Sequence, residues 1–113
     1  MKFLVADDHA VFRVGLLYLL QRLDTEAEIL EASDYAEALE IAEREDSIDL
    51  ILVDLLMPGI EGYSGISGLR DRSRSAPIIV VSARENPADV QASLDNGAMG
   101  YLPKSSSSEV MLN

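Results

Sequence analysis

The run Asp49-Leu50-Ile51-Leu52-Val53-Asp54-Leu55 decides the fold of this chain. Its apolar residues follow one another without a polar break until Asp54, and the turn residues Pro58 and Gly59 come soon after. A short, continuous apolar run closed by a turn is typical of a strand that is buried on both faces, at the middle of a parallel sheet. We therefore predict that Asp54 stands at the end of a central strand.

On either side of this run, short apolar stretches alternate with longer segments of helical period. Further strands are predicted at 3–6, 28–32, 77–82 and 100–103, and helices at 11–23, 34–44, 60–74 and 86–97. A fifth helix is predicted to begin at Ser106 and to be truncated at Asn113. The alternation predicts one α/β domain over residues 1–113. Its fold is expected to be flavodoxin-like: a five-stranded parallel sheet of order 2-1-3-4-5 with helices on both faces.

Local signals mark the ends of several elements. Asp34, with Glu37 three residues later, has the spacing of a capping box at a helix start. Asn86 followed by Pro87 supplies an N-cap with proline at the first helical position. Pro103 lacks a backbone donor, so the strand at 100–103 is predicted to lie at the edge of the sheet.

Two helical segments have unusual compositions. The segment 11–23 is so rich in apolar residues that it is predicted to be well buried. The segment 60–74 is interrupted by Gly62, Gly65 and Gly68, and a glycine costs about 1 kcal/mol relative to alanine inside a helix. We expect that helix to be short or mobile.

The composition excludes several classes of function. The chain has no cysteine and one histidine, so disulfides, thiolate metal sites and a structural zinc site are not expected. Its formal net charge is −11, which repels nucleic acid and anionic lipid. With no apolar stretch of membrane-spanning length and no signal-peptide core, a cytoplasmic protein is predicted.

Polar residues follow the predicted strands at one edge of the sheet. Asp7 and Asp8 follow the first strand, Asp54 ends the third, Ser82 ends the fourth and Lys104 follows the fifth. Ligands of such sheets bind beyond the carboxyl ends of the strands, where the strand order reverses. Three carboxylates that converge there repel one another unless a cation neutralises them. Oxygen ligands of this kind favour Mg²⁺.

This set of residues predicts phosphoryl chemistry. A carboxylate such as that of Asp54 can attack phosphorus when a metal ion and a fixed positive charge neutralise the transferring group. Lys104 supplies that charge, and the Ser82 hydroxyl can donate to a phosphoryl oxygen. Taken singly, Asp8 is better explained as a helix cap, Ser82 as a turn residue and Lys104 as a surface charge. His9 is left out of the site, because Mg²⁺ seldom binds imidazole.

With these features in place, the whole chain resembles the CheY-like response-regulator receiver domains. The features that match are Asp7-Asp8 after the first strand, Asp54 with Met57-Pro58-Gly59 behind it, Ser82-Ala83 after the fourth strand, and Gly100-Tyr101-Leu102-Pro103-Lys104 at the fifth. The segment 97–105 is similar to the NarL/FixJ (LuxR-type) subfamily, whose members usually carry a C-terminal helix-turn-helix domain that binds DNA. The resemblance implies that such an output domain follows in the full-length protein.

The resemblance also implies roles for single residues. Asp54 would be the phosphoacceptor, and Mg²⁺ would be held by Asp8, Asp54 and the backbone carbonyl of Leu56, with Asp7 reaching it through water. Ser82 and Lys104 would hold the phosphoryl group.

Three further positions would tune or report the phosphorylated state. Tyr101 would rotate inward with the hydroxyl of Ser82, and so change the face formed by the fourth helix, the fifth strand and the fifth helix. Leu56 and Arg84 stand at the positions that tune the lifetime of the phosphoryl group. Because Leu56 cannot orient a hydrolytic water, slow self-dephosphorylation is predicted.

The implied function is that of a two-component response regulator. Its partners would be a sensor histidine kinase, DNA through the output domain only, and a second copy of the chain as a candidate, through the face just described or another receiver face. The chain would be a phosphoacceptor that promotes its own phosphorylation and dephosphorylation, and not an enzyme.

Three other functions compete with this one. A pseudo-receiver would be a pure interaction module without phosphorylation, but the acids, Ser82 and Lys104 are all present. A hydrolase with an aspartyl nucleophile usually has a second acid two residues later, where this chain has Leu56. A flavin or dinucleotide site would need glycines after the first strand, where the sequence is Asp7-Asp8-His9.

Overall fold

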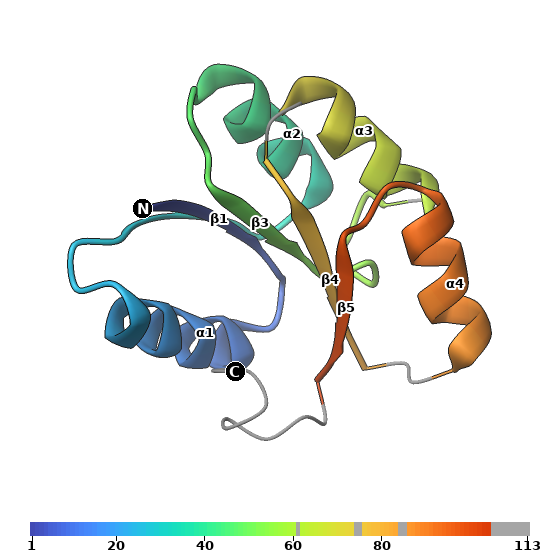
Figure 1. The fold of residues 1–113 in the computed structure, drawn as a ribbon, viewed down its shortest axis with the longest axis horizontal. Helices are drawn as coiled ribbons and strands as arrows, with labels where there is room; N and C mark the ends of the chain where they lie inside the picture. Colours follow the sequence, from blue (N-terminus) through green and yellow to red (C-terminus); the bar gives the residue numbers. More distant parts are fainter. Residues whose placement is uncertain (61, 74–75, 84–85, 105–113) are drawn as a thin grey trace.

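The computed structural model describes residues 1–60, 62–73, 76–83 and 86–104. Its five strands form one parallel sheet in the order β2-β1-β3-β4-β5, as predicted (Figure 1). The strands are β1 (Lys2–Ala6), β2 (Glu28–Ala32), β3 (Leu50–Val53), β4 (Ile78–Ser82) and β5 (Gly100–Pro103). The helices between them are α1 (Ala10–Leu23), α2 (Tyr35–Arg44), α3 (Ser64–Arg72) and α4 (Pro87–Asp95). The predicted fifth helix falls outside the described residues.

The register of the sheet brings the ends of the strands to one level. Ala6 at the end of β1 pairs with Ala32 of β2 and with Val53 of β3. At the other side of the sheet, Ser82 of β4 pairs with Pro103 of β5. The residues that follow these strands therefore leave from the same edge. β5 is one of the two edge strands of the sheet, which confirms the edge position predicted from Pro103.

Two apolar clusters cover the two faces of the sheet, because alternate residues of each buried strand point to opposite sides. On one face, Leu4 and Ile51 pack with residues of α2 and α3. On the other face, Val5 and Leu52 pack with Leu16 of α1. Helices therefore lie on both faces, as predicted, with α1 on the side opposite to α2 and α3 (Figure 1).

The prediction that the first helix is well buried is wrong. Only Leu16 and Leu20 of α1 are buried, whereas Val11, Val14 and Tyr18 are exposed. The reason is geometric: one narrow stripe of a helix of period 3.6 faces the sheet, and apolar residues outside that stripe stay in contact with solvent. The richness of the sequence in apolar residues therefore does not measure the burial of this helix.

The capping signals are confirmed. The backbone N–H of Glu37 donates to Asp34 Oδ1 at 2.8 Å, and the Glu37 carboxylate accepts from the N–H of Ser33 at 3.1 Å. At the start of α4, the N–H of Ala88 donates to the Asn86 side chain at 2.9 Å. These side chains take up backbone donors that the first turn of a helix leaves without partners.

The glycines of α3 have a packing role that their helix propensity does not suggest. The helix is short, as predicted, and it begins after Gly62, whose φ is +60°. The ring of Tyr35 lies against Gly65 and Gly68, and its hydroxyl donates to the carbonyl of Gly65 at 3.0 Å. A Cβ atom at Gly68 would overlap the Tyr35 hydroxyl oxygen. The missing side chains thus let α2 approach α3.

Candidate functional site

The structure brings Asp7, Asp8, Asp54 and Lys104 together at the carboxyl edge of the sheet, and we call these four residues the carboxyl-edge site. The backbone places them, because the N–H of Asp54 donates to the carbonyl of Ala6 at 2.9 Å. In the same way, the N–H of Lys104 donates to the carbonyl of Ser82 at 2.7 Å. The loop after β3 is therefore held beside β1, and the loop after β5 is held beside β4.

The Asp54 side chain is almost completely buried, with 1% of its surface exposed. Its Oδ1 accepts the backbone N–H of Leu56 at 2.9 Å, and its Oδ2 accepts Lys104 Nζ at 2.8 Å. A buried carboxylate needs such partners, since burial without them would be costly. One oxygen is therefore fixed by the loop that follows β3, and the other by the cation that follows β5.

Lys104 is the cation shared by the two buried carboxylates. Its Nζ lies 2.8 Å from Asp54 Oδ2 and 3.0 Å from Asp7 Oδ2. Burial lowers the pKa of Lys104, but the hydrogen bonds to Asp54 and Asp7 outweigh it, so the pKa stands above its ordinary value. The ammonium also lies 4.7 Å from the centre of the Phe12 ring. Lys104 is thus held as a charged group inside the site.

Asp7 is buried, whereas Asp8 is exposed. Asp7 Oδ1 accepts the backbone N–H of His9 at 2.8 Å. Within the described residues, Asp7 Oδ2 accepts no hydrogen bond; Lys104 pairs with it by charge only. The capping role considered for Asp8 is not observed, because the N-cap of α1 is His9 and no side-chain hydrogen bond caps that helix.

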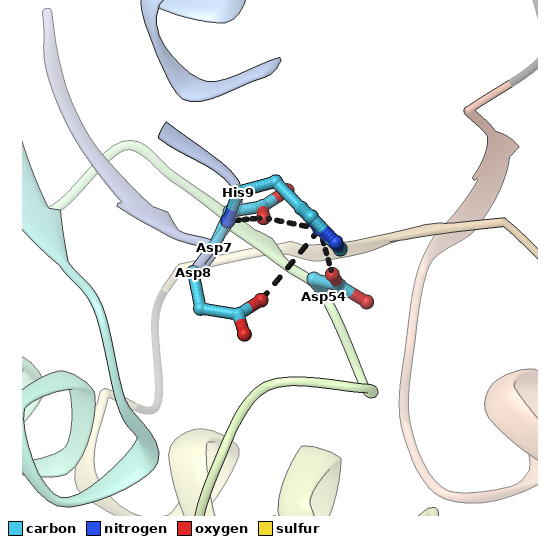
Figure 2. Close-up of side chains that lie close together, drawn as sticks. All are labelled: Asp7, Asp8, His9 and Asp54. Atoms are coloured by element: carbon cyan, nitrogen blue, oxygen red, sulfur yellow. Dashed lines mark hydrogen bonds and ion pairs between the residues drawn. The ribbon is translucent and has the colours of Figure 1, made fainter. Parts of the chain in front are cut away.

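His9, which the sequence analysis left out, points into the same space (Figure 2). Its Nδ1 lies 3.4 Å from Asp7 Oδ1, 3.6 Å from Asp8 Oδ1 and 3.5 Å from Asp54 Oδ2. His9 and the three aspartates each offer one ligand atom, and these four atoms lie within 4.8 Å of one another. The signal that could have found His9 is its position directly after the two acids.

The donor set of the carboxyl-edge site fits a divalent cation. Three carboxylates converge there, and Lys104 is the cation in contact with Asp7 and Asp54. The buried Asp7 Oδ2, which accepts no hydrogen bond from the described residues, is suited to a hard ion such as Mg²⁺.

A cavity of about 280 Å³ lies next to this site and gathers other predicted positions. Ser82, Tyr101 and Leu56 line it, together with Tyr63 of the loop before α3 and Asp89 of α4. The Tyr63 hydroxyl donates to the Asp89 carboxylate. Ser82 is buried and Leu56 is exposed. Arg84, the remaining predicted position, lies outside the described residues.

None of the described helices combines the length and the apolar character needed to cross a bilayer.

The comparisons with known proteins agree on one family. The model of the response regulator receiver domain matches residues 3–113. The nitrate/nitrite response regulator protein NarP of Escherichia coli is 42% identical over 110 residues, which are 96% of this chain and 50% of that protein. The chain spans about half the length of the curated relatives it matches.

Solved structures agree with this comparison. A response regulator from Burkholderia pseudomallei, solved with a phosphorylated aspartic acid and a calcium ion, has a TM-score of 0.85 and 32% identity. That match covers 98% of this chain and 64% of the other. The receiver domain of a sensor histidine kinase from Pseudomonas aeruginosa, solved with magnesium in its active-site cleft, has a TM-score of 0.81 and 27% identity, covering 97% and 89%. On its fold, its family match and its relatives, this chain belongs to the response regulator receiver domain family, with NarL and NarP among its relatives.

Proposed function

We propose that Asp54 accepts a phosphoryl group from a sensor histidine kinase, in a reaction that depends on Mg²⁺. The observation that carries the proposal is the setting of the Asp54 carboxylate. It is 1% exposed, 2.8 Å from the Lys104 ammonium, and next to two further carboxylates at the carboxyl edge of the sheet. The phosphorylated aspartate of the Burkholderia pseudomallei regulator supports the same chemistry.

The attack of Asp54 on phosphorus is the one covalent step that the transfer needs from the protein. An oxygen of Asp54 attacks the phosphorus of the phosphohistidine of the kinase, so that a P–O bond forms and the P–N bond breaks. The electron pair of the P–N bond stays on the imidazole nitrogen, which takes up a proton. Catalysis of such a transfer comes from positioning and from neutralisation of charge.

Mg²⁺ would be held by Asp7, Asp8, Asp54 and the backbone carbonyl of Leu56, and would supply positive charge to the phosphoryl oxygens. Lys104 already contacts Asp54, and its ammonium would bind the new phosphoryl oxygens. Ser82, at the end of β4, would donate its hydroxyl to the phosphoryl group. Leu56 offers no group to orient water, which supports a long-lived acyl phosphate.

Phosphorylation would then change the face made by α4, β5 and a following helix. The cavity between Ser82 and Tyr101 supports this, because it leaves space into which the Tyr101 ring can turn when the hydroxyl moves. A shift of this kind works only by stabilising one of two pre-existing states. Through that face the domain would control an output domain that binds DNA, or pair with a second copy of the chain.

In this proposal the chain is a phosphoacceptor and not an enzyme, and it acts in the cytoplasm. The second candidate is a pseudo-receiver that binds partners without phosphorylation. The exposed apolar side chains of α1, such as Val11 and Tyr18, would suit an interaction module. They do not distinguish the two candidates, since a regulator also needs surfaces for its partners.

The test is phosphorylation in solution. The protein is incubated with Mg²⁺ and acetyl phosphate, and its intact mass is followed; a parallel sample receives beryllofluoride and is followed by NMR. We expect a mass gain of one phosphoryl group, and NMR shifts that extend to Tyr101. Asp54→Asn should abolish both effects. Asp46→Asn, which removes an exposed carboxylate remote from the site, should abolish neither.

Three outcomes would contradict the proposal. An unmodified wild-type protein without NMR shifts would favour the interaction module. An adduct that persists in Asp54→Asn would assign the phosphoryl group to another residue. Phosphorylation at the same rate after removal of Mg²⁺ with a chelator would separate the reaction from the metal.

A further inference from the structure

Four lone-pair donors of this site converge on a single cation, the ammonium of Lys104. Its Nζ lies 2.8 Å from Asp54 Oδ2, 3.3 Å from Asp7 Oδ1 and 3.0 Å from Asp7 Oδ2. The fourth donor is His9 Nδ1, also at 2.8 Å. An imidazole nitrogen therefore belongs to the group of atoms that surrounds a positive charge.

The contact with Lys104 indicates the tautomer of His9. An ammonium group has three donors and no acceptor, so Nδ1 accepts the hydrogen bond through its lone pair. In a neutral imidazole that accepts at Nδ1, the proton is on Nε2. This is also the tautomer in which Nδ1 can bind a metal ion, and its lone pair points toward the carboxylates.

The distances between donors fit a small metal ion. His9 Nδ1 lies 3.4 to 3.6 Å from one oxygen each of Asp7, Asp8 and Asp54. With metal–ligand bonds of about 2.1 Å, two ligands of a tetrahedral ion are separated by about 3.4 Å. The four ligand atoms lie within 4.8 Å of one another. One ion can therefore reach all four residues if the exposed side chains of Asp8 and His9 move toward the buried carboxylates and the Lys104 ammonium moves aside.

A mixed set of one imidazole and three carboxylates differs chemically from a magnesium site. Mg²⁺ prefers oxygen ligands in an octahedron, whereas Zn²⁺ binds imidazole and carboxylate readily and accepts four ligands. We propose that His9 joins Asp7, Asp8 and Asp54 as a ligand for Zn²⁺, so that zinc competes with Mg²⁺ for this site.

A second observation points to a ligand here, independently of the grouping of acids. The Asp7 side chain is 2% exposed, and its Oδ2 accepts no hydrogen bond from any described residue. A buried carboxylate oxygen in that state is costly unless a cation completes its surroundings. Lys104 supplies a charge at 3.0 Å, and a divalent ion would supply a bond.

The consequence for regulation rests on the proposed function. An ion that binds His9 and all three carboxylates takes the place of Mg²⁺, and with four protein ligands it has no position left for a phosphoryl oxygen. Zinc bound in this way would therefore inhibit phosphorylation that Mg²⁺ supports, and the inhibition would depend on His9.

The test compares metal affinities of the whole chain by calorimetry in metal-free buffer. Wild type, His9→Ala and Val11→Ala are each titrated with Zn²⁺ and, separately, with Mg²⁺. We expect His9→Ala to lower the ratio of zinc affinity to magnesium affinity by about tenfold or more, as expected for loss of a ligand. Val11→Ala, an exposed change in the first turn of α1, should leave the ratio as in wild type.

Two further readouts show where the ion binds. Co²⁺, used as a spectroscopic probe, should give a visible absorption spectrum typical of four ligands in wild type, and a different one in His9→Ala. Asp54→Asn should also weaken zinc binding, which places the ion at this site and not at another acidic part of the surface. An unchanged affinity ratio and an unchanged cobalt spectrum in His9→Ala would overturn the proposal.

The two proposals fail separately. If zinc binding depends on His9 but acetyl phosphate does not modify Asp54, the metal site stands and the phosphoacceptor role falls. If Asp54 is phosphorylated with Mg²⁺ but zinc binds wild type and His9→Ala alike, the phosphoacceptor role stands and His9 is only a hydrogen-bond partner of Lys104.

Discussion

Two glycines of the chain should respond in opposite ways to the same substitution. Gly15 in α1 has open space where a Cβ atom would lie, so Gly15→Ala should raise the free energy of unfolding by about 1 kcal/mol through helix propensity. Gly68→Ala in α3 gains the same amount from helix propensity. There, however, the new Cβ would overlap the hydroxyl of Tyr35, which is bonded to the carbonyl of Gly65.

The cost at Gly68 can be worked out from these contacts. Moving the Tyr35 ring breaks a hydrogen bond worth about 1 kcal/mol and adds the strain of overpacking, about 1–3 kcal/mol. After the gain in propensity is subtracted, Gly68→Ala should destabilise the protein by about 1–3 kcal/mol. In a Tyr35→Phe background the nearest remaining ring atom, Cζ, is 3.5 Å from the new Cβ, an ordinary contact. Gly68→Ala should then be neutral or stabilising.

The assay is urea unfolding followed by circular dichroism, for Gly15→Ala and the four proteins of the double-mutant cycle: wild type, Gly68→Ala, Tyr35→Phe and the double variant. We expect an interaction energy of about 2–4 kcal/mol in the cycle, well above the error for independent sites. Additivity of the two changes would refute the packing argument. So would a Gly68→Ala protein that is as stable as Gly15→Ala.

Three further predictions concern the site and the charges around it. Lys104→Ala should lower the free energy of unfolding by about 3 kcal/mol in metal-free buffer, because two buried carboxylates lose their cation, and Mg²⁺ should restore part of it. Lys2→Ala, which breaks a partly exposed pair with Glu45, should cost at most about 1 kcal/mol and not respond to Mg²⁺. The free energy of unfolding should fall as the pH rises above about 10. In the folded state the pKa of Lys104 is raised by its carboxylate partners and the pKa of Tyr35 is raised by burial. The folded state therefore retains protons that the unfolded state has lost. Urea midpoints measured against pH should fall less steeply in Tyr35→Phe, and an equal slope would contradict this account. Leu56→Asn should shorten the lifetime of the acyl phosphate on Asp54, measured by loss of the phosphoryl mass, and a lifetime that stays the same or lengthens would count against the role predicted for Leu56.

The sheet could be predicted from the sequence because its strands carry strong signals. The apolar run that ends at Asp54 has the pattern of a strand buried on both faces, and the structure places it at the centre of the sheet. Pro103 indicated an edge strand for a physical reason that holds in any sheet. The meeting of Asp7, Asp54 and Lys104 then followed from topology, since the ends of parallel strands share one edge.

Features that depend on side-chain packing could not be predicted in this way. The glycines of α3 were interpreted through their helix propensity, but their contact with Tyr35 joins residues about thirty positions apart, and no local pattern reveals it. The exposure of Val11 and Val14 depends on which stripe of α1 faces the sheet. His9 was excluded by its preference for metals other than Mg²⁺, whereas its place in the site depends on the direction of one side chain.

The sheet order also determines when the charges of the site meet as the chain is synthesised. Synthesis starts at the N-terminus, so β1 and β3 can pair as soon as residue 53 is available, and that pairing brings Asp7 close to Asp54. Lys104 emerges from the ribosome about fifty residues later, after β4 and α4. Any pairing of β1 with β3 that precedes Lys104 would bring the two carboxylates together without their ammonium. The ammonium of Lys104 is the last charged group of the carboxyl-edge site to be synthesised.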